Sequence, residues 1–448
     1  GENPEAVAEK GIAYARGLES TGILSVSKHF PGHGDTSEDS HETLPVVRHN
    51  RARLDSVELL PFKRYIYDGF AGIMTGHLYV PALDKSHKPA SFSKAVVTDL
   101  LQKELGFQGL CFTDALAMKG ASTKKTDNPS VKALLAGNDI LLAPAAPIND
   151  FTAAIEEGVL DLEAIEAKCL KILRYKYIAG LNAYKPVETK GLSKRLNSPH
   201  AAWMAAKLNS EAITVLKNED TILPLKQLNK KKIAALSIGD GVGNEFQKML
   251  GEYDSIACFS IGRRSTAAQV QQVYNKLQKY DVIICGVHTI RIPESLALRQ
   301  LAAKKELVYA FFTLPYACKE YKKSIEKAKA VVLAYEGTPL AQEYAAQVIF
   351  GGIAAKGKLP VSIPGLYYAG TGVFTEKTRL GYHQPEEVGA NPDRLDVIES
   401  IVKEGLDEKA YPGCQVLVAK DGMIIYNKSF GYFDYESRQP VTEASVYD

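Results

Sequence analysis

The segment 28–45, KHFPGHGDTSEDSHETLP, gathers many side chains that can carry a proton. It holds three histidines, two aspartates, two glutamates and one lysine within eighteen positions. Pro31, Gly32 and Gly34 would break the hydrogen-bond ladder of any helix through this segment. The pattern therefore predicts a loop, and loops rich in titratable groups are where binding and catalytic residues concentrate.

Asp39 and His41 stand two positions apart in this loop, within EDSH. In an extended segment residues i and i+2 face the same way, so the carboxylate can reach one ring nitrogen of the histidine. A carboxylate partner fixes the tautomer of an imidazole and leaves its other nitrogen free to exchange a proton. The spacing is compatible with an acid/base dyad and also with a surface histidine beside an acidic cluster.

Asp114 closes the run LCFTD, which is apolar until its last two residues. A carboxylate at the end of a buried strand can act as a nucleophile at a sugar carbon. It can also be the N-cap of a helix beginning in the following ALAMKG segment, because Asp is favoured there. Lys28, His29 and His77 also lie at predicted strand ends, where they could bind sugar hydroxyls or simply face solvent.

A metal site is a further alternative for the loop. Its ligands would be His29, His33, Asp35, Asp39 and His41. No pair has the helical spacing of an HExxH motif, because Pro31 and Gly32 separate the first two histidines. A second short motif, GDGVG at 239–243, follows a predicted strand but lacks the spacing of a nucleotide-binding loop, and so favours a plain turn.

The elements that position these residues alternate between strands and helices. Strands are expected at 22–27, 71–77, 107–114 and 138–144, and helices at 53–69, 93–105 and, as a pair, 148–177. This alternation predicts an α/β fold with a parallel sheet, and polar groups at the carboxyl ends of its strands are typical of a β/α barrel. A whole barrel takes about 250 residues and eight strands. The pattern thus predicts only the C-terminal half of a TIM-type barrel.

A second α/β pattern starts near residue 200. Compact apolar runs at 231–240, 281–287, 306–312 and 330–337 predict an open sheet between helix layers. The segment 382–393, YHQPEEVGANPD, is expected to be a linker. Beyond it, alternating apolar residues around Asp421-Gly422 predict a β-hairpin that opens a third, antiparallel domain.

The composition of the 448 residues is that of an ordinary globular protein, with 46% hydrophobic and 24% charged residues. A net charge of +2 and the lack of a basic block argue against a nucleic-acid partner, and no apolar run approaches the length of a membrane span. The six scattered cysteines contain no CxxC pair and predict free thiols, with Cys111 and Cys285 buried. The first residues lack an initiator Met and already show helical spacing, which suggests a cut rather than a natural start and leaves the compartment open.

Taken together and in this order, KHFPGHGDTSEDSH, IMTGHLYVPALD and GLCFTDALAMKG resemble glycoside hydrolase family 3, and more narrowly its β-N-acetylglucosaminidase branch. The KHFPGHG segment followed by DSH is the most specific part of this resemblance. It implies a retaining glycosidase with Asp114 as nucleophile and His41, assisted by Asp39, as acid/base. Lys28 and His29 match the family's sugar-binding pair, and the chemistry implied needs no metal or organic cofactor.

The resemblance also implies a domain order. Residues 1–188 would be the barrel domain without its N-terminal part, and residues 189–388 an α/β sandwich domain. Residues 389–448 resemble the truncated start of an α+β domain of the class C β-lactamase-like serine hydrolases, whose S-x-x-K motif would come later. The family's sugar-contacting arginine would precede this segment, so another segment is expected to complete the barrel.

The implied substrate is a terminal β-linked N-acetylglucosamine in peptidoglycan fragments or chitin-like oligosaccharides. A family 3 β-glucosidase or an N-acetylglucosaminide phosphorylase would share the same pocket. In the β-glucosidases the second domain often supplies the acid, and Glu336 in AYEGTP is the residue to watch under that alternative. A catalytically silent sugar-binding module would keep Lys28 and His29 but form no covalent intermediate.

Overall fold

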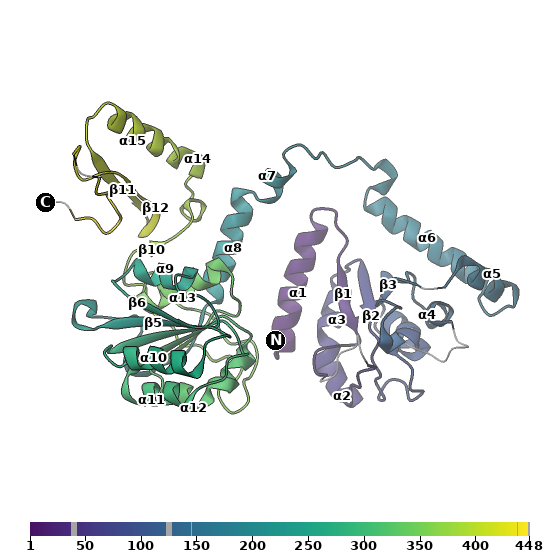
Figure 1. Ribbon diagram of the computed structural model, residues 1–448. Helices are drawn as coiled ribbons and strands as arrows, with labels where there is room; N and C mark the ends of the chain where they lie inside the picture. The colour runs from purple at the N-terminus through teal and green to yellow at the C-terminus, as the bar shows by residue number, and fades with distance from the viewer. Residues whose placement is uncertain (37–42, 122–127, 145, 437, 447–448) are drawn as a thin grey trace. The chain divides into compact units, whose positions relative to one another are not determined.

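The computed structural model describes residues 1–36, 43–121, 128–144, 146–436 and 438–446 (Figure 1). The chain forms two compact units, Gly1–Val187 and Glu188–Asp448. Both units combine helices with β-sheet, which confirms the α/β class expected from the sequence.

The N-terminal unit is built on a parallel sheet with the strand order β1-β2-β3. Its strands are β1 (Val26–Phe30), β2 (Gly72–Thr75) and β3 (Leu110–Thr113). Its α-helices are α1 (Pro4–Glu19), α2 (Arg51–Arg53), α3 (Leu60–Tyr67), α4 (Pro129–Ala136), α5 (Ile148–Glu156) and α6 (Leu162–Ile178). π-Helical segments span Leu54–Glu58 and Ala95–Glu104, and 3₁₀ turns span Ala90–Phe92, Lys119–Ala121 and Leu181–Ala183.

One apolar core holds this sheet and its helices together. Phe30, Ile73 and Cys111, one from each strand, are fully buried and belong to the same cluster as Phe62 of α3 and Leu101 of the second π-helical segment. Burial of this kind contributes roughly 1.5–3 kcal/mol per large apolar side chain. The packing fixes the three strands side by side, so that their carboxyl ends lie along one edge.

The first strand lies later in the chain than the sequence suggested. It was expected at 22–27, whereas β1 covers Val26–Phe30 and therefore contains Lys28 and His29. The loop rich in titratable groups begins only after Phe30, at Pro31.

The expected strand at 138–144 is not formed, and only a single parallel bridge joins Ile140 to Phe112. Side-chain oxygens accept hydrogen bonds from backbone N–H groups that would donate to backbone carbonyls in a regular sheet. The Asp139 carboxylate accepts from the Cys111 N–H at 2.9 Å, and the Thr113 hydroxyl accepts from the Leu142 N–H at 3.0 Å. The segment is thus fixed beside β3 without becoming a strand.

The C-terminal unit contains a six-stranded sheet with the order β4-β9-β8-β7-β5-β6. Its strands are β4 (Thr214–Asn218), β5 (Ile233–Ile238), β6 (Ala257–Ile261), β7 (Val282–Val287), β8 (Glu306–Phe311) and β9 (Ala330–Leu333). Its α-helices are α7 (Leu192–Leu196), α8 (Pro199–Ala212), α9 (Glu245–Gly251), α10 (Ala267–Leu277), α11 (Leu296–Lys304), α12 (Lys322–Ile325) and α13 (Pro339–Phe350). Only β4 runs antiparallel to its neighbour, and the apolar pattern of the sequence does not predict β6.

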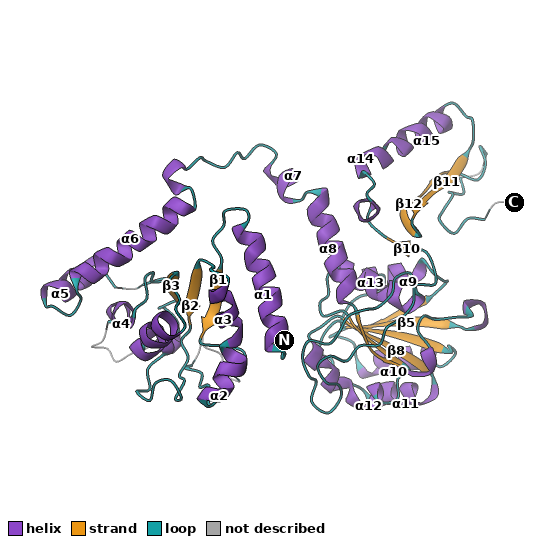
Figure 2. Ribbon diagram, turned by 180° about the vertical axis from the view of Figure 1, so that it is seen from behind, coloured by secondary structure: helices purple, strands orange, loops and turns teal. Residues whose placement is uncertain are grey.

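Helices cover both faces of this sheet, with α9 and α13 on one side and α10, α11 and α12 on the other (Figure 2). Alternate residues along each strand enter the two cores: in β7, Val282 and Ile284 face one, and Ile283 and Cys285 face the other. A strand buried on both faces reads as a continuous apolar run, which is why the runs in this half of the sequence were informative.

A second, smaller sheet has the order β10-β12-β11, with β10 (Gly381–Tyr382), β11 (Gly413–Lys420) and β12 (Met423–Gly431). Helices α14 (Pro392–Leu395) and α15 (Val397–Asp407) precede the hairpin. The predicted hairpin is confirmed: Asp421 and Gly422 connect β11 to β12 with φ values of 54° and 74°. Positive φ at both turn positions is the requirement of a type I′ turn, and Asp-Gly meets it.

The linker expected at 382–393 is instead ordered. The Gln347 side chain accepts from the Tyr382 N–H at 2.8 Å and donates to the Tyr382 carbonyl at 2.7 Å. A 3₁₀ helix follows at Pro385–Val388, and Val388 is buried. Proline, glycine and charged residues resemble a linker in composition, but these tertiary hydrogen bonds fix the segment to α13.

All six cysteines are free thiols, and Cys111 and Cys285 are buried, as expected. Among the described residues, no helix is both long and apolar enough to cross a membrane.

Candidate active site

Asp114 lies directly beyond β3, at the carboxyl edge of the parallel sheet. Its N–H donates to the Thr75 carbonyl of β2 at 2.9 Å, which ties its backbone to the neighbouring strand. One carboxylate oxygen, Oδ1, accepts from the Ala115 N–H at 2.8 Å. No α-helix begins here, because turns lead into the 3₁₀ segment at Lys119–Ala121, so the helix N-cap alternative is wrong.

His29 faces the other oxygen of this carboxylate. Its Nε2 lies 3.6 Å from Asp114 Oδ2, and the two side chains are 25% and 13% exposed. Burial lowers the pKa of His29, and Lys28 and the neighbouring histidines act in the same direction, whereas the Asp114 charge opposes them. The site thus places a half-buried imidazole beside a largely buried carboxylate, with a gap longer than a hydrogen bond.

His77 supports the segment that follows Asp114. The ring is fully buried, and burial lowers its pKa, which favours the neutral form. Its Nε2 lies 3.2 Å from the Ala115 carbonyl, and its Nδ1 lies 2.7 Å from the Ser91 hydroxyl. A carbonyl only accepts, so Nε2 carries the proton and Nδ1 accepts from Ser91. Both ring nitrogens therefore have protein partners.

Two of the remaining predicted residues, Lys28 and Glu336, have exposed side chains. Lys28 is exposed, and within the described part of the chain its ammonium group has no ion-pair partner. Asp39 and His41 lie outside the described residues, so the dyad predicted for them remains a prediction. Glu336, the alternative acid, is exposed in the C-terminal unit and accepts a hydrogen bond from the Thr338 hydroxyl at 2.9 Å.

Of the ligands predicted for a metal site in the loop, Asp39 and His41 lie outside the described residues, and Asp35 belongs to a group that could hold an ion. Among the described residues, the group of three whose ligand atoms lie within 4.8 Å of one another is Asp35, His49 and Glu58. Nε2 of His49 lies 2.8 Å from Oδ2 of Asp35. Nδ1 of His33 instead forms a hydrogen bond with the Thr36 hydroxyl. Arg53 donates to Glu58 at 3.1 Å and thus supplies a positive charge within this group. Sequence reasoning missed His49 and Glu58 because both lie beyond the loop.

Comparison with known proteins shows what the N-terminal part of the chain is similar to. Residues 1–175 match the Glycosyl hydrolase family 3 N terminal domain. The chain is 36% identical over 254 residues to Beta-hexosaminidase A of Pseudoalteromonas piscicida, covering 50% of this chain and 41% of that protein. It is 41% identical over 119 residues to the Beta-hexosaminidase of Neisseria meningitidis serogroup C (strain 053442), covering 27% of this chain and 32% of that protein. The chain thus spans less than half the length of these relatives.

Solved structures resemble more of the chain. A glycoside hydrolase family 3 β-N-acetylglucosaminidase from Paenibacillus sp. str. FPU-7 has a TM-score of 0.67 and 28% identity, covering 80% of this chain and 71% of that one. Beta-glucoside phosphorylase BglX has a TM-score of 0.68 at 22% identity, covering 81% of this chain and 70% of that one, and so shares the fold. The family match thus covers residues 1–175, and it is to the N-terminal domain of the glycosyl hydrolase family 3.

Proposed function

We propose that this chain is part of a retaining exo-β-N-acetylglucosaminidase that removes terminal β-linked N-acetylglucosamine. The observation that carries the proposal is the Asp114 carboxylate at the carboxyl edge of the sheet, held by the Ala115 N–H and facing His29. Similarity to proteins named Beta-hexosaminidase and to a family 3 β-N-acetylglucosaminidase supports the choice of substrate.

Asp114 is the proposed nucleophile. The hydrogen bond from Ala115 to Oδ1 fixes the carboxylate rotamer and leaves Oδ2 for attack on the anomeric carbon. This attack breaks the bond between the anomeric carbon and the leaving oxygen, and a covalent glycosyl–enzyme intermediate forms. Lys28 and His29 are proposed to bind sugar hydroxyls beside this bond. His77 is also proposed for substrate binding, although its described contacts are to Ser91 and Ala115.

His41, assisted by Asp39, is the proposed acid/base. It would donate a proton to the leaving oxygen in the first step and accept one from water in the second, which returns the carboxylate to its starting state. This scheme requires only a carboxylate and a proton carrier from the protein.

The domain order belongs to the same proposal. We infer a partial β/α barrel in residues 1–188, an α/β sandwich domain in residues 189–388 and the start of a β-lactamase-like domain in residues 389–448. Peptidoglycan fragments or chitin-like oligosaccharides are the substrates that this combination suggests.

The test uses purified protein with an aryl β-N-acetylglucosaminide, and an aryl β-glucoside in parallel. Asp114→Ala should lower turnover of the N-acetylglucosaminide by at least about a thousandfold. His41→Ala should lower it by at least about a hundredfold. Asp99→Ala, which removes an exposed carboxylate paired with Lys103, is the matched control and should leave turnover unchanged.

Other outcomes identify the alternatives. Full activity in His41→Ala would contradict its role and direct attention to Glu336. Preferential turnover of the glucoside would favour a β-glucosidase, and turnover that requires phosphate would favour a phosphorylase. If the wild type binds N-acetylglucosamine but releases no aryl alcohol, the chain is a sugar-binding module.

A further inference from the structure

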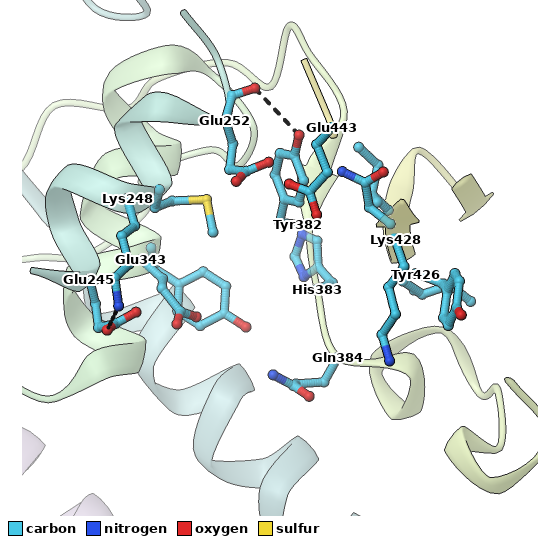
Figure 3. A pocket seen from close by; sticks show the side chains of 15 residues that line it. Glu245, Lys248, Glu252, Glu343, Tyr382, His383, Gln384, Tyr426, Lys428 and Glu443 are labelled. Carbon is cyan, nitrogen blue, oxygen red and sulfur yellow. Dashed lines mark hydrogen bonds and ion pairs between the residues drawn. The ribbon is translucent and has the colours of Figure 1, made fainter. Parts of the chain in front are cut away.

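Buried polar side chains form hydrogen-bonded clusters in both units. In the C-terminal unit, His383 lies beside a pocket of about 430 Å³ (Figure 3), and its Nδ1 is 2.9 Å from one oxygen of Glu387. The other oxygen of Glu387 accepts from the Tyr344 hydroxyl of α13 at 2.9 Å. These bonds fix the segment after β10 to α13, so this cluster serves the fold of its own unit.

Asn138 is the centre of a corresponding cluster in the N-terminal unit, where its side chain is fully buried. Its Nδ2 donates to the carbonyls of Ser91 and Ala133, each at 2.8 Å, and its Oδ1 lies 2.8 Å from the Thr75 hydroxyl. Carbonyls only accept, so the amide nitrogen must face them, and the Thr75 hydroxyl must donate to Oδ1. The Asn138 amide is thus hydrogen-bonded to three separate segments of the unit.

The end of α4 fixes the backbone of Asn138. Gly137 follows the helix with a φ of 119°, and a Cβ at this position would lie 2.5 Å from the Thr98 hydroxyl oxygen. Glycine satisfies both the left-handed conformation and the close approach. The Asn138 N–H then donates to the Ala133 carbonyl at 3.2 Å, which closes the last turn of α4.

A first path leads from Asn138 to the backbone of Asp114. Thr75 is the last residue of β2, and its carbonyl accepts from the Asp114 N–H at 2.9 Å. The Thr75 hydroxyl lies between Asn138 Oδ1 and the Phe112 carbonyl of β3, which is 3.1 Å away. Asn138 therefore holds the residue that ties Asp114 to the neighbouring strand.

A second path leads to the carboxylate of Asp114. The Ser91 carbonyl accepts from Asn138, and the Ser91 hydroxyl donates to Nδ1 of His77 at 2.7 Å. Nε2 of His77 donates to the Ala115 carbonyl at 3.2 Å, and the Ala115 N–H donates to Asp114 Oδ1 at 2.8 Å. The two paths thus begin at the same amide and end at the same residue.

We propose that Asn138 is a positioning residue for the nucleophile, because its amide supports both the backbone and the carboxylate of Asp114. The inference rests on the proposed function, in which Asp114 attacks the anomeric carbon. Such an attack requires the reacting atoms to be aligned at about 3–3.5 Å. Loss of the Asn138 amide therefore lowers kcat more than it raises KM.

Steady-state kinetics of the intact chain on an aryl β-N-acetylglucosaminide tests the proposal. Asn138→Leu removes the amide, and Asn138→Asp keeps its shape but places a carboxyl oxygen against two carbonyls. Each should lower kcat by at least about tenfold and change KM by less than about twofold. Thermal unfolding of each variant establishes that the fold is retained.

Thr75 provides a milder pair of variants, which also covers the case in which the Asn138 variants do not fold. Thr75→Val removes the hydroxyl that donates to Asn138 and should lower kcat by about threefold to tenfold. Thr75→Ser retains the hydroxyl and should recover most of that loss. Equal kcat in Thr75→Val and the wild type would overturn the first path.

A double-mutant cycle tests the second path, because Asn138 and His77 both belong to it. Asn138→Leu combined with His77→Ala should lose less kcat than the product of the two single losses. Losses that multiply would show that the two residues act independently, and would overturn the proposal.

Gln102→Leu is the matched control. The Gln102 amide donates to the carbonyl of Gly137 at 2.9 Å, directly beside Asn138, and its Nε2 also lies 3.4 Å from Sγ of Cys111. Its loss should lower the temperature of unfolding but leave kcat unchanged. A loss of kcat equal to that of Asn138→Leu would mean that general destabilisation explains the effect, and would overturn the proposal.

Hydrogen–deuterium exchange provides a readout that does not depend on turnover. In Asn138→Leu, amides of the segment 110–116 should exchange at least about tenfold faster than in the wild type, whereas those of β7 should be unchanged. Unchanged exchange in 110–116, or unchanged kcat while Asp114→Ala is inactive, would overturn the role of Asn138 alone. Full turnover in Asp114→Ala would instead contradict the proposed function and, with it, this inference.

Discussion

His77 connects two strand ends in the N-terminal unit through hydrogen bonds from a buried ring. It follows β2, and its Nε2 donates to the carbonyl of Ala115, the residue whose N–H orients the Asp114 carboxylate. The Ser91 hydroxyl donates to Nδ1 and fixes the tautomer. His77 is thus a positioning residue for Asp114, in addition to the substrate contact proposed for it.

Replacing His77 by alanine should destabilise the fold by about 2 kcal/mol, because Ser91 and Ala115 would each lose a buried hydrogen-bond partner. It should also lower kcat on an aryl N-acetylglucosaminide by about tenfold, since misplacement of a nucleophile slows the chemical step. Urea denaturation and steady-state kinetics measure the two effects. His77→Gln, which retains a donor for Ala115, should recover part of kcat, and the exposed His200→Ala should change neither quantity. Unchanged kcat in His77→Ala would exclude the positioning role.

His288 makes stability depend on pH. Its side chain is 8% exposed and stacks on Phe312, and burial lowers its pKa from 6.5 to about 4, against the opposing charge of Asp240. Between pH 6.5 and 4 the unfolded chain binds a proton at His288 that the folded chain does not, so stability falls as the pH falls. The full shift corresponds to about 3 kcal/mol.

Urea denaturation at pH 7, 6, 5 and 4.5 can isolate this contribution. His288→Gln removes the titrating group while keeping an acceptor for the Asn244 amide, which lies 3.4 Å from Nε2 in the wild type. The free energy of unfolding should decrease less steeply below pH 6.5 in this variant than in the wild type. Parallel pH profiles would show that His288 does not titrate in this window.

At the residue scale, the sequence predicted where the side chains lie relative to the strands better than it predicted their hydrogen-bond partners. Asp114 and His77 could be assigned to positions after strands because apolar runs precede them, whereas His29 lies inside β1, which begins later than the sequence suggested. The partners of His77 could not be predicted, because Ser91 and Ala115 come from segments that only the tertiary fold brings together. The same holds for His49, which reaches Asp35 across fourteen residues.

At the scale of elements, contacts of the Asp139 side chain fix the segment 138–144, where the sequence predicts a strand. The side chain is 3% exposed; it accepts from the Cys111 N–H of β3 and forms ion pairs with Lys171 at 2.8 Å and Lys168 at 3.5 Å. One carboxylate thereby joins β3 to helix α6. An apolar run predicts a strand. It does not show that the Asp139 carboxylate will accept the hydrogen bond from the Cys111 N–H of β3.

Asp139→Ala should destabilise the N-terminal unit by about 3 kcal/mol, because it leaves two partly buried ammonium groups and a strand N–H without their acceptor. Thermal or urea denaturation measures this change. The control is Asp99→Ala, which removes the acceptor of an exposed i,i+4 pair with Lys103 and should change stability by less than about 1 kcal/mol. Equal effects of the two substitutions would contradict the assignment of Asp139 as a buried link.

At the scale of the whole molecule, the two compact units have separate apolar cores. The clusters of the N-terminal unit draw their buried residues from positions 15–160, and those of the C-terminal unit from positions 206–363. The continuous apolar runs after residue 200 allowed the large sheet to be predicted from the sequence. The ordering of 382–393 could not be predicted, because it depends on Gln347 of α13.

Separate cores predict that the C-terminal unit folds without the N-terminal one. A protease recognition sequence inserted between Val187 and Glu188, where the chain is exposed and lacks helix or strand, should leave thermal unfolding unchanged. After cleavage, the fragment from Glu188 onward should keep its own cooperative transition, because both apolar clusters on the faces of its large sheet stay intact. The same insertion after Gln271, inside α10, should lower that transition, because α10 covers one face of the sheet. If cleavage after Val187 abolished the transition instead, the C-terminal unit would depend on the N-terminal one for its stability.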